Sequence, residues 1–258
     1  MIGCKGTIVD AFAAAPAYDA DMAKLPMQSL LDDAGLNRHH VFNLSDLPAD
    51  VLVPLSPSIQ ERQLILLGHA GRRLWTRVQS EGVDALHPID DYSVRTVENW
   101  LRQALPQAQA RFVFPQGLPE GRHIGLQQLG TLAGWHHAAP FMVGVDARWG
   151  SWFAYRAAIV TNTQLQPSVA ENSEHPCLNC RDKPCINACR GQALGSGALD
   201  MQACFSQRLK TDSVCALSCP ARQACPVGAE HRYEDSQIVH GAKYSLAAIR
   251  EYVLGKPL

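Results

Sequence analysis

The segment CLNCRDKPCINAC, residues 177–189, and the segment CALSCPARQACP, residues 215–226, decide how the chain is organised. They carry seven of the nine cysteines, and an eighth lies between them. Two cubane iron–sulfur clusters require eight thiolates, four for each. Short spacings bring two or three sulfurs of one loop to a cluster, and the fourth ligand usually comes from farther along the chain. The pattern therefore predicts two 4Fe–4S clusters, held by Cys177, Cys180, Cys185, Cys189, Cys204, Cys215, Cys219 and Cys225.

The prolines of the second segment agree with this prediction, and three alternatives compete with it: a disulfide scaffold, two structural zinc sites, and structural cysteines that bind nothing. Pro220 and Pro226 each follow a cysteine, and proline helps to turn the backbone away from a cluster because it fixes φ and lacks an N–H. A disulfide scaffold is typical of small secreted chains. Two structural zinc sites usually need paired CxxC elements or closely spaced histidines. The ninth cysteine, Cys4, stands apart from the others and is given no role.

Length and composition indicate a large domain followed by a small one. The chain has 258 residues, 47% of them hydrophobic, and all cysteines but Cys4 follow residue 176. We predict a cofactor-binding core at 1–165 and an iron–sulfur domain at 166–258, with 166–175 as the linker. The formal charge of −1 and the absence of a long basic run make nucleic acid an unlikely partner. No apolar stretch is long enough to span a bilayer, and reduced cysteines without a leader point to the cytoplasm.

Hydrophobic patterning predicts strands and helices mixed along the first domain. Expected strands are 63–67, 111–114, 140–145 and 152–161, the last two joined as a hairpin near Gly150. Ser93 is expected to cap a helix that follows a turn. The remaining expectation is a loop at 44–57 and helices at 22–34, 72–79, 93–105, 125–134 and 244–253. The order of these elements predicts an α+β sandwich around one sheet.

One stretch carries a family resemblance. AGWHHAAPFMVGVDARWGSWFA, residues 133–154, resembles the AGLGWIGKNTLL…GSWFF segment of epoxyqueuosine reductases, and reductive dehalogenases share its theme. The cysteine plan is similar too. The resemblance implies one cluster held by Cys177, Cys180, Cys185 and Cys225, and a second held by Cys189, Cys204, Cys215 and Cys219. The chain departs from the epoxyqueuosine reductases at residues 115–123. The family has a proton-donating aspartate in the corresponding segment, and this segment contains no aspartate, so the sequence does not favour a role in tRNA maturation.

A second resemblance covers the front half of the chain. LILLG at 64–68, HPIDDY at 87–92 and GSWFAYR at 150–156 are similar to the cobalamin-processing CblC family. Both families imply a nitroreductase-like core that holds a corrinoid or, alternatively, FMN, followed by a ferredoxin-like domain. The implied cofactor-binding residues are Gly134, Trp135, His136, His137, Trp152 and Arg156. Arg156 corresponds to an arginine associated with thiol or anion contact, and the alternative is that it pairs with a carboxylate. For the histidines, tryptophans and Gly134 the alternative is a role in core packing or in a turn.

Together these features predict an oxidoreductase that passes electrons through two clusters to a bound cobalamin. Cobalt reduction needs a strongly reducing donor, and cubane clusters reach several hundred millivolts below zero. Reduced ferredoxin, flavodoxin or a flavin reductase is the expected electron donor. The alternatives are a non-catalytic cobalamin carrier, a ferredoxin-like electron-transfer protein, and the same core with FMN in place of the corrinoid. No catalytic residue is identified from the sequence.

Overall fold

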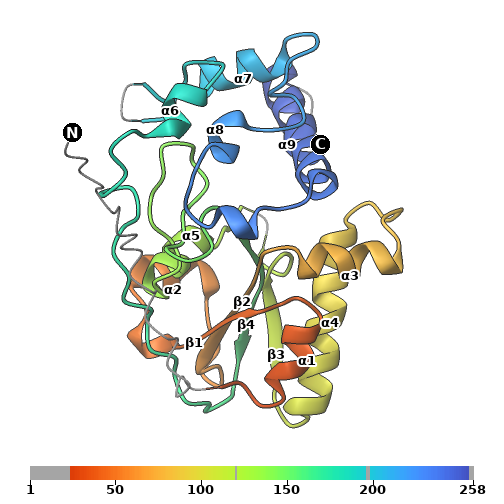
Figure 1. Ribbon diagram of the computed structural model, residues 1–258. Coiled ribbons are helices and arrows are strands. Elements are labelled where there is room, and N and C mark those ends of the chain that lie inside the picture. Colours follow the sequence, from red (N-terminus) through yellow and green to blue (C-terminus); the bar gives the residue numbers. More distant parts are fainter. Residues whose placement is uncertain (1–23, 120, 196–197, 256–258) are drawn as a thin grey trace, which may run out of the picture.

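The computed structural model describes residues 24–119, 121–195 and 198–255, and these form an α+β fold around one antiparallel sheet (Figure 1). The strand order is β1-β2-β4-β3. Every residue of β2 is buried, and so are the last five of β4, because apolar side chains cover both faces of the central strands. The strands are β1 (Arg38–Asn43), β2 (Gln63–Ala70), β3 (Ala110–Phe114) and β4 (Phe153–Thr161).

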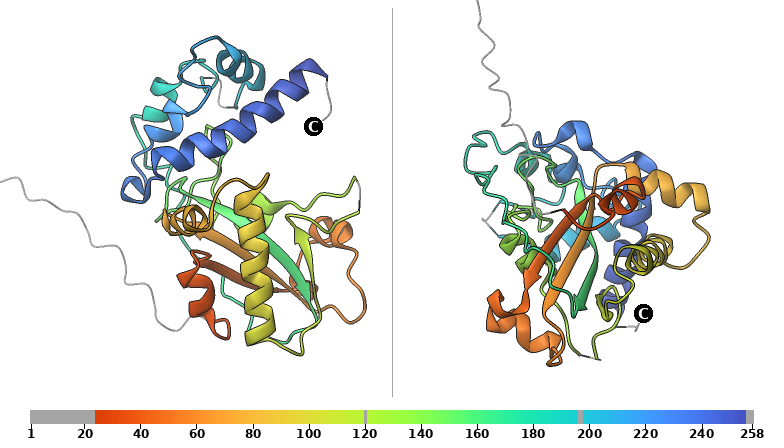
Figure 2. Two further views of the ribbon diagram at one scale, coloured as in Figure 1. Left: turned by 90° about the vertical axis from the view of Figure 1, so that its right-hand side faces the viewer. Right: turned by 90° about the horizontal axis from the view of Figure 1, so that it is seen from below.

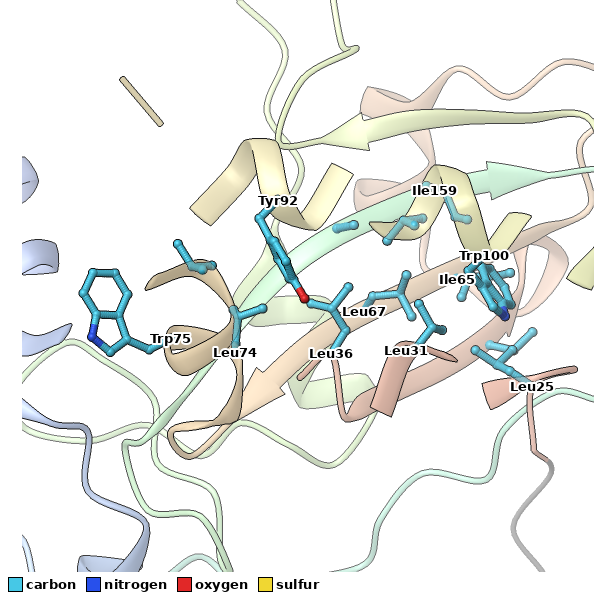
Figure 3. Close-up of a cluster of buried hydrophobic side chains, with 14 residues drawn as sticks. Leu25, Leu31, Leu36, Ile65, Leu67, Leu74, Trp75, Tyr92, Trp100 and Ile159 are labelled. Atoms are coloured by element: carbon cyan, nitrogen blue, oxygen red, sulfur yellow. The ribbon is translucent and has the colours of Figure 1, made fainter. Parts of the chain in front are cut away.

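Helices cover both faces of this sheet. One face carries α1 (Gln28–Asp33), α3 (Arg73–Glu81) and α4 (Pro88–Ala104), whose Leu31, Leu74 and Trp100 pack against Ile65 and Ile159 (Figure 3). The other face carries α2 (Ala49–Leu55) and α5 (Leu126–Leu132), and a short 3-10 helix, η1 (Leu44–Asp46), lies beside them. Alternating side chains of β2 and β4 therefore enter two separate cores, as a two-residue period requires.

The cysteine-rich segment forms short helices beyond one end of the sheet, as Figure 2 shows. Phe141, Leu194 and Ala221 make a small core with Cys185 and Cys225. The long helix α9 returns to the first core, where Trp75 Nε1 donates to Ser236 Oγ at 2.8 Å. The elements of this part are α6 (Pro184–Ala188), α7 (Met201–Leu209), α8 (Pro220–Gln223), η2 (Ala229–His231) and α9 (Asp235–Leu254).

The strands predicted at 63–67, 111–114 and 152–161 and the helices at 72–79 and 125–134 are confirmed with small shifts of their ends. The predicted strand at 140–145 is wrong. In its place, single bridges join His137 to Val145 and Asp146 to Gly150. The predicted loop at 44–57 is also wrong, because it contains η1 and α2.

Two helices begin earlier than predicted. Helix α4 starts at Pro88, where proline suits the first turn because no N–H is needed there. Ser93 therefore lies inside the helix and donates to the carbonyl of Ile89 instead of capping. Helix α9 starts at Asp235 rather than at 244, and Val253 near its end is 52% exposed.

The remaining differences concern the amino-terminal part. Strand β1 was missed, because its sequence RHHVFN is too polar to signal a strand. Of the helix predicted at 22–34, only Gln28–Asp33 is helical, and residues 22 and 23 lie outside the described part, as does Cys4. None of the described helices has the length and apolar character that crossing a membrane needs.

Buried histidines of β1 and β2 predict how stability depends on pH. His40 is 3% exposed, and burial together with the Arg38 guanidinium lowers its pKa from 6.5 to about 4. The unfolded chain therefore binds the proton first, so stability is lost as the pH falls below about 6.5. Between about pH 7 and pH 5, His40 costs about 2 kcal/mol of unfolding free energy.

Denaturant melts of the wild type and of a His40→Gln variant test this prediction. The wild type should lose about 2 kcal/mol more than the variant across that pH range. Equal pH dependence of the two proteins would contradict a neutral buried His40.

Candidate functional site

A cavity of about 600 Å³ lies between the end of the sheet and the cysteine-rich segment. The ends of β2 and β4 contribute His69 and Phe153, and α9 contributes Ile238 and Ile249. Most of the lining is apolar, and the volume is within the range of about 300–1,000 Å³ common for small-molecule sites. The cavity is therefore the candidate site.

A bulge in the central pair of strands directs Arg156 to this cavity. Leu67 pairs with Ala157, and Gly68 pairs with Tyr155, so Arg156 stands outside the ladder. Bulges re-aim side chains in this way and are common beside active sites. Arg156 lines the cavity, and its Nη1 lies 3.4 Å from Oδ1 of Asp90 in α4.

His69 sits at the same end of the cavity and is neutral. Its Nε2 lies 2.9 Å from the Tyr233 hydroxyl and 3.4 Å from Nε2 of Gln237. Burial holds the pKa of His69 well below its usual value, and the guanidiniums of Arg156 and Arg222 lower the pKa further. A strand residue, Tyr233 just before α9 and Gln237 in its first turn thus form one buried polar group.

Several buried polar atoms around the cavity have no hydrogen-bond partner. They are Nδ1 of His69, Nε1 of Trp152, Nε of Arg156 and Oε1 of Gln237. All four residues line the cavity. Because buried polar groups are nearly always paired, these atoms mark a place where a bound molecule can complete the hydrogen bonding.

The eight cysteines of the described chain are all free thiols, and they act on one another in two sets. Burial raises the pKa of Cys177, and the thiols of Cys225, Cys185 and Cys180 raise it further. For the other set, burial raises the pKa of Cys204, and Cys219, Cys189 and Cys215 add to it. The family resemblance implied the same division of the cysteines, and their role as cluster ligands stays a prediction.

The spacing of the thiols bears on what each set can hold. Within the described residues, no three His, Cys, Asp or Glu side chains are grouped to bind one metal ion. A cubane gives each thiolate its own iron, so its ligands stand farther apart than those of a single ion. Two sets of four free thiols fit two such clusters, and the cavity is lined by Cys189, Cys204, Cys215 and Cys219.

The segment GSWF joins the sheet to the cysteine-rich part. Arg222, in α8 between Cys219 and Cys225, donates from Nε to Ser151 Oγ at 3.2 Å and from Nη2 to the Ser151 carbonyl. A Cβ on Gly150 would lie 1.9 Å from the carbonyl oxygen of Val227. This close backbone contact and the Arg222 bonds fix the second cysteine run against the start of β4.

The sequence-predicted cofactor residues fall into two groups. Trp152 and Arg156 line the cavity, whereas Gly134, Trp135, His136 and His137 are not among the residues that line it. Trp135 is 1% exposed and packs in the core under α5, with the Arg38 guanidinium 4.6 Å above its ring.

The neighbours of Trp135 also contact protein. A Cβ on Gly134 would lie 2.0 Å from the carbonyl oxygen of Glu171. Nδ1 of His136 is 3.3 Å from the Tyr155 hydroxyl, and Nε2 of His137 is 3.0 Å from Ser173 Oγ. A cofactor contact for these four residues stays a prediction.

Sequence reasoning missed His69, Arg222, Tyr233 and Gln237 as site residues. His69 offered one signal, because it is a polar residue directly after the apolar run LILLG of β2. The other three come from the segment around and after the last cysteines, and only the fold brings them to the end of the sheet.

Comparison with solved structures finds proteins that share this fold, although no family model and no curated protein matches the sequence. An epoxyqueuosine reductase bound to an epoxyqueuosine-modified tRNA stem loop matches with a TM-score of 0.51 and 15% identity, over 82% of this chain and 68% of that one. A catabolic reductive dehalogenase matches with a TM-score of 0.50 and 9% identity, over 88% of this chain and 36% of that one.

These two matches confirm, at the level of the fold, the predicted resemblance to epoxyqueuosine reductases and reductive dehalogenases. The B12-trafficking protein CblC of C. elegans also matches, with a TM-score of 0.49 and 14% identity, over 87% of this chain and 94% of that one. The chain thus spans about two thirds of the epoxyqueuosine reductase and about a third of the dehalogenase. At such identities the similarity establishes the fold and leaves the activity to be proposed.

The contact at Gly150 predicts a destabilising substitution. Gly150→Ala places a methyl group against the Val227 carbonyl at a positive φ of 60°, so the backbone at Gly150 or at Val227 must move. We expect a loss of about 2 kcal/mol or more in the free energy of unfolding.

The matched control is Gly241→Ala in α9, where an added Cβ meets nothing within 4 Å. Because alanine favours a helix interior, this variant should be as stable as the wild type or more so. Equal stability of the two variants would contradict a close contact between Gly150 and the Val227 carbonyl.

Proposed function

We propose that the protein is an iron–sulfur oxidoreductase that passes electrons through two 4Fe–4S clusters to a corrinoid held in the cavity. The observation that carries the proposal is the lining of that cavity. One wall is the end of the sheet, with Trp152 and Arg156, and the opposite wall contains Cys189, Cys204, Cys215 and Cys219. A group bound there is in contact with both parts of the protein.

In this proposal each set of thiols holds one cluster. Cys177, Cys180, Cys185 and Cys225 hold the cluster farther from the cavity, and the other set holds the cluster beside it. The eight free thiols and their mutual effects within two sets support this division. The outer cluster would receive electrons from reduced ferredoxin, flavodoxin or a flavin reductase.

The chain's own residues bind and shield the cofactor. Trp152 offers an indole N–H, Arg156 offers an unpaired Nε–H, and apolar side chains such as Phe141 and Leu194 exclude water. A bound corrinoid would supply a cobalt that is reduced and then transfers electrons to a substrate or loses its upper ligand. FMN in the same cavity and a non-catalytic cobalamin carrier are the alternatives.

The division of the chain into two domains is also part of this proposal. Residues 1–165 would be a nitroreductase-like core and residues 166–258 a ferredoxin-like domain, and the fold shared with epoxyqueuosine reductase supports it. That reductase binds a tRNA stem loop, whereas we propose a corrinoid and no nucleic acid here. A gel-shift assay with tRNA separates the two.

Metal content tests the cluster assignment. Anaerobically purified protein should contain about eight irons and eight sulfides per chain. Cys180→Ser and Cys219→Ser should each retain about four, because each removes one ligand of a different cluster. Cys4→Ser is the control and should retain all eight. Zinc in place of iron, or iron without sulfide, contradicts the assignment.

A cavity-filling variant tests the cofactor. The wild type should bind cobalamin, and dithionite should convert its absorbance spectrum to that of a reduced form. Ala154→Trp places an indole ring in the cavity and should abolish cobalamin binding without loss of iron, whereas Ala147→Trp, at an exposed position outside the lining, should bind normally. A flavin spectrum in the purified protein, or binding unaffected by Ala154→Trp, contradicts a corrinoid in this cavity.

A further inference from the structure

The cavity has an imbalance of charge. Four arginines line it, and no aspartate or glutamate is among its described lining residues. Two of the four, Arg190 and Arg208, lie next to cysteines of the lining. Arg190 follows Cys189, and Arg208 donates from Nε to the Cys215 carbonyl at 3.1 Å. The other two, Arg156 and Arg222, lie beside His69.

The guanidinium of Arg222 forms no ion pair with any described carboxylate. It donates to Ser151 and lies between two aromatic rings, 4.5 Å from that of Trp152 and 5.1 Å from that of Tyr233. Arg156 has only a long contact to Asp90, whose side chain is 39% exposed. Both residues are partly buried, and the side chain of Arg156 is 19% exposed. Because a charge with little access to water is costly unless it is paired, two guanidiniums at one end of an apolar cavity favour an anion there.

The unpartnered atoms of this end have the chemistry to bind it. Nε1 of Trp152 and Nε of Arg156 are N–H donors without an acceptor. Trp152 and His69 are 0% and 2% exposed, so bulk water does not reach their side chains to complete the hydrogen bonding. Charge-assisted hydrogen bonds from arginine to carboxylate or phosphate are among the strongest in proteins.

From this geometry we infer that the end of the cavity formed by His69, Trp152, Arg156 and Arg222 binds the oxyanion, carboxylate or phosphate, of a ligand whose remainder is apolar. Phe141, Phe153, Leu194, Leu199 and Ile249 line the space for that remainder. Anion binding itself does not require the clusters. Only the nearness of the ligand to a cluster rests on the proposed function.

The oxyanion has two sources, the phosphate of a cofactor or the carboxylate of a substrate. Calorimetric titrations of the full-length, anaerobically purified protein distinguish them with two pairs of probes. FMN and riboflavin differ by a phosphate, and octanoate and octanol differ by a carboxylate. In at least one pair the anion should bind about tenfold or more tightly than its neutral partner. Equal affinities within both pairs overturn the inference.

Variants then assign the anion to this end of the cavity. Arg156→Gln should weaken the preferred anion by about tenfold and leave its neutral partner unchanged. Arg95→Gln is the control, because Arg95 is 58% exposed on the same helix as Asp90. Asp90→Asn should tighten anion binding several-fold, since it removes the carboxylate that competes for Arg156.

The Asp90 variant decides the matter even if Arg156→Gln fails to fold, because a merely structural ion pair predicts no gain in affinity. Unchanged or weaker anion binding by Asp90→Asn contradicts the inference. Iron and sulfide are assayed on the same samples. Absent clusters with anion selectivity intact contradict the proposed function alone, and intact clusters without selectivity contradict this inference alone.

Discussion

The contact between the start of β4 and the second cysteine run is the constraint on which the candidate site depends. Gly150 has no side chain, so the Val227 carbonyl approaches its Cα directly, and Arg222 binds both the carbonyl and the hydroxyl of Ser151. A turn held by Asp146 leads into this contact, and Arg38 pairs with Asp146 at 2.9 Å in the buried core. Because these bonds fix both partners, the sheet and the thiols form opposite walls of one cavity.

The electrostatics of the cavity follow from the same arrangement. Arg222 binds Ser151 and so holds the second cysteine run against β4. The same position brings its positive charge to an apolar cavity that Arg156 also lines. These two charges keep His69 neutral, since they lower the pKa that burial has already lowered. An anion from outside the chain offsets a charge that no described carboxylate pairs with. The Arg222 guanidinium thus both holds Ser151 at the start of β4 and takes part in the proposed binding of an oxyanion.

The sequence predicted the parts of this protein that local pattern specifies. The apolar run of β2 and the helix that carries Leu74, Trp75 and Val78 are such cases. The cysteine spacing predicted cluster ligands, whereas the division into two sets of thiols came from the family resemblance. The prediction failed at β1, whose histidines and arginine are buried by tertiary contacts that no local pattern reveals.

The site was predicted only in part for a similar reason. Trp152 and Arg156 follow the conspicuous Gly150 and line the cavity as expected. The segment 134–137 carries much of the family resemblance, but it packs against the core and the segment 171–173. Tyr233 lies more than 160 residues from His69, so their 2.9 Å contact depends on the closure of α9 onto the sheet and cannot be read from sequence.

The central claim is that the cofactor binds in the cavity next to one cluster, and electron paramagnetic resonance tests it most directly. In protein reduced so that both the clusters and the bound cobalt are paramagnetic, the account predicts spin–spin coupling between cobalt and one cluster. Cys219→Ser should abolish the coupling, and Cys180→Ser should preserve it. A cobalt signal unaffected by cluster reduction, or coupling that survives Cys219→Ser, would contradict the account.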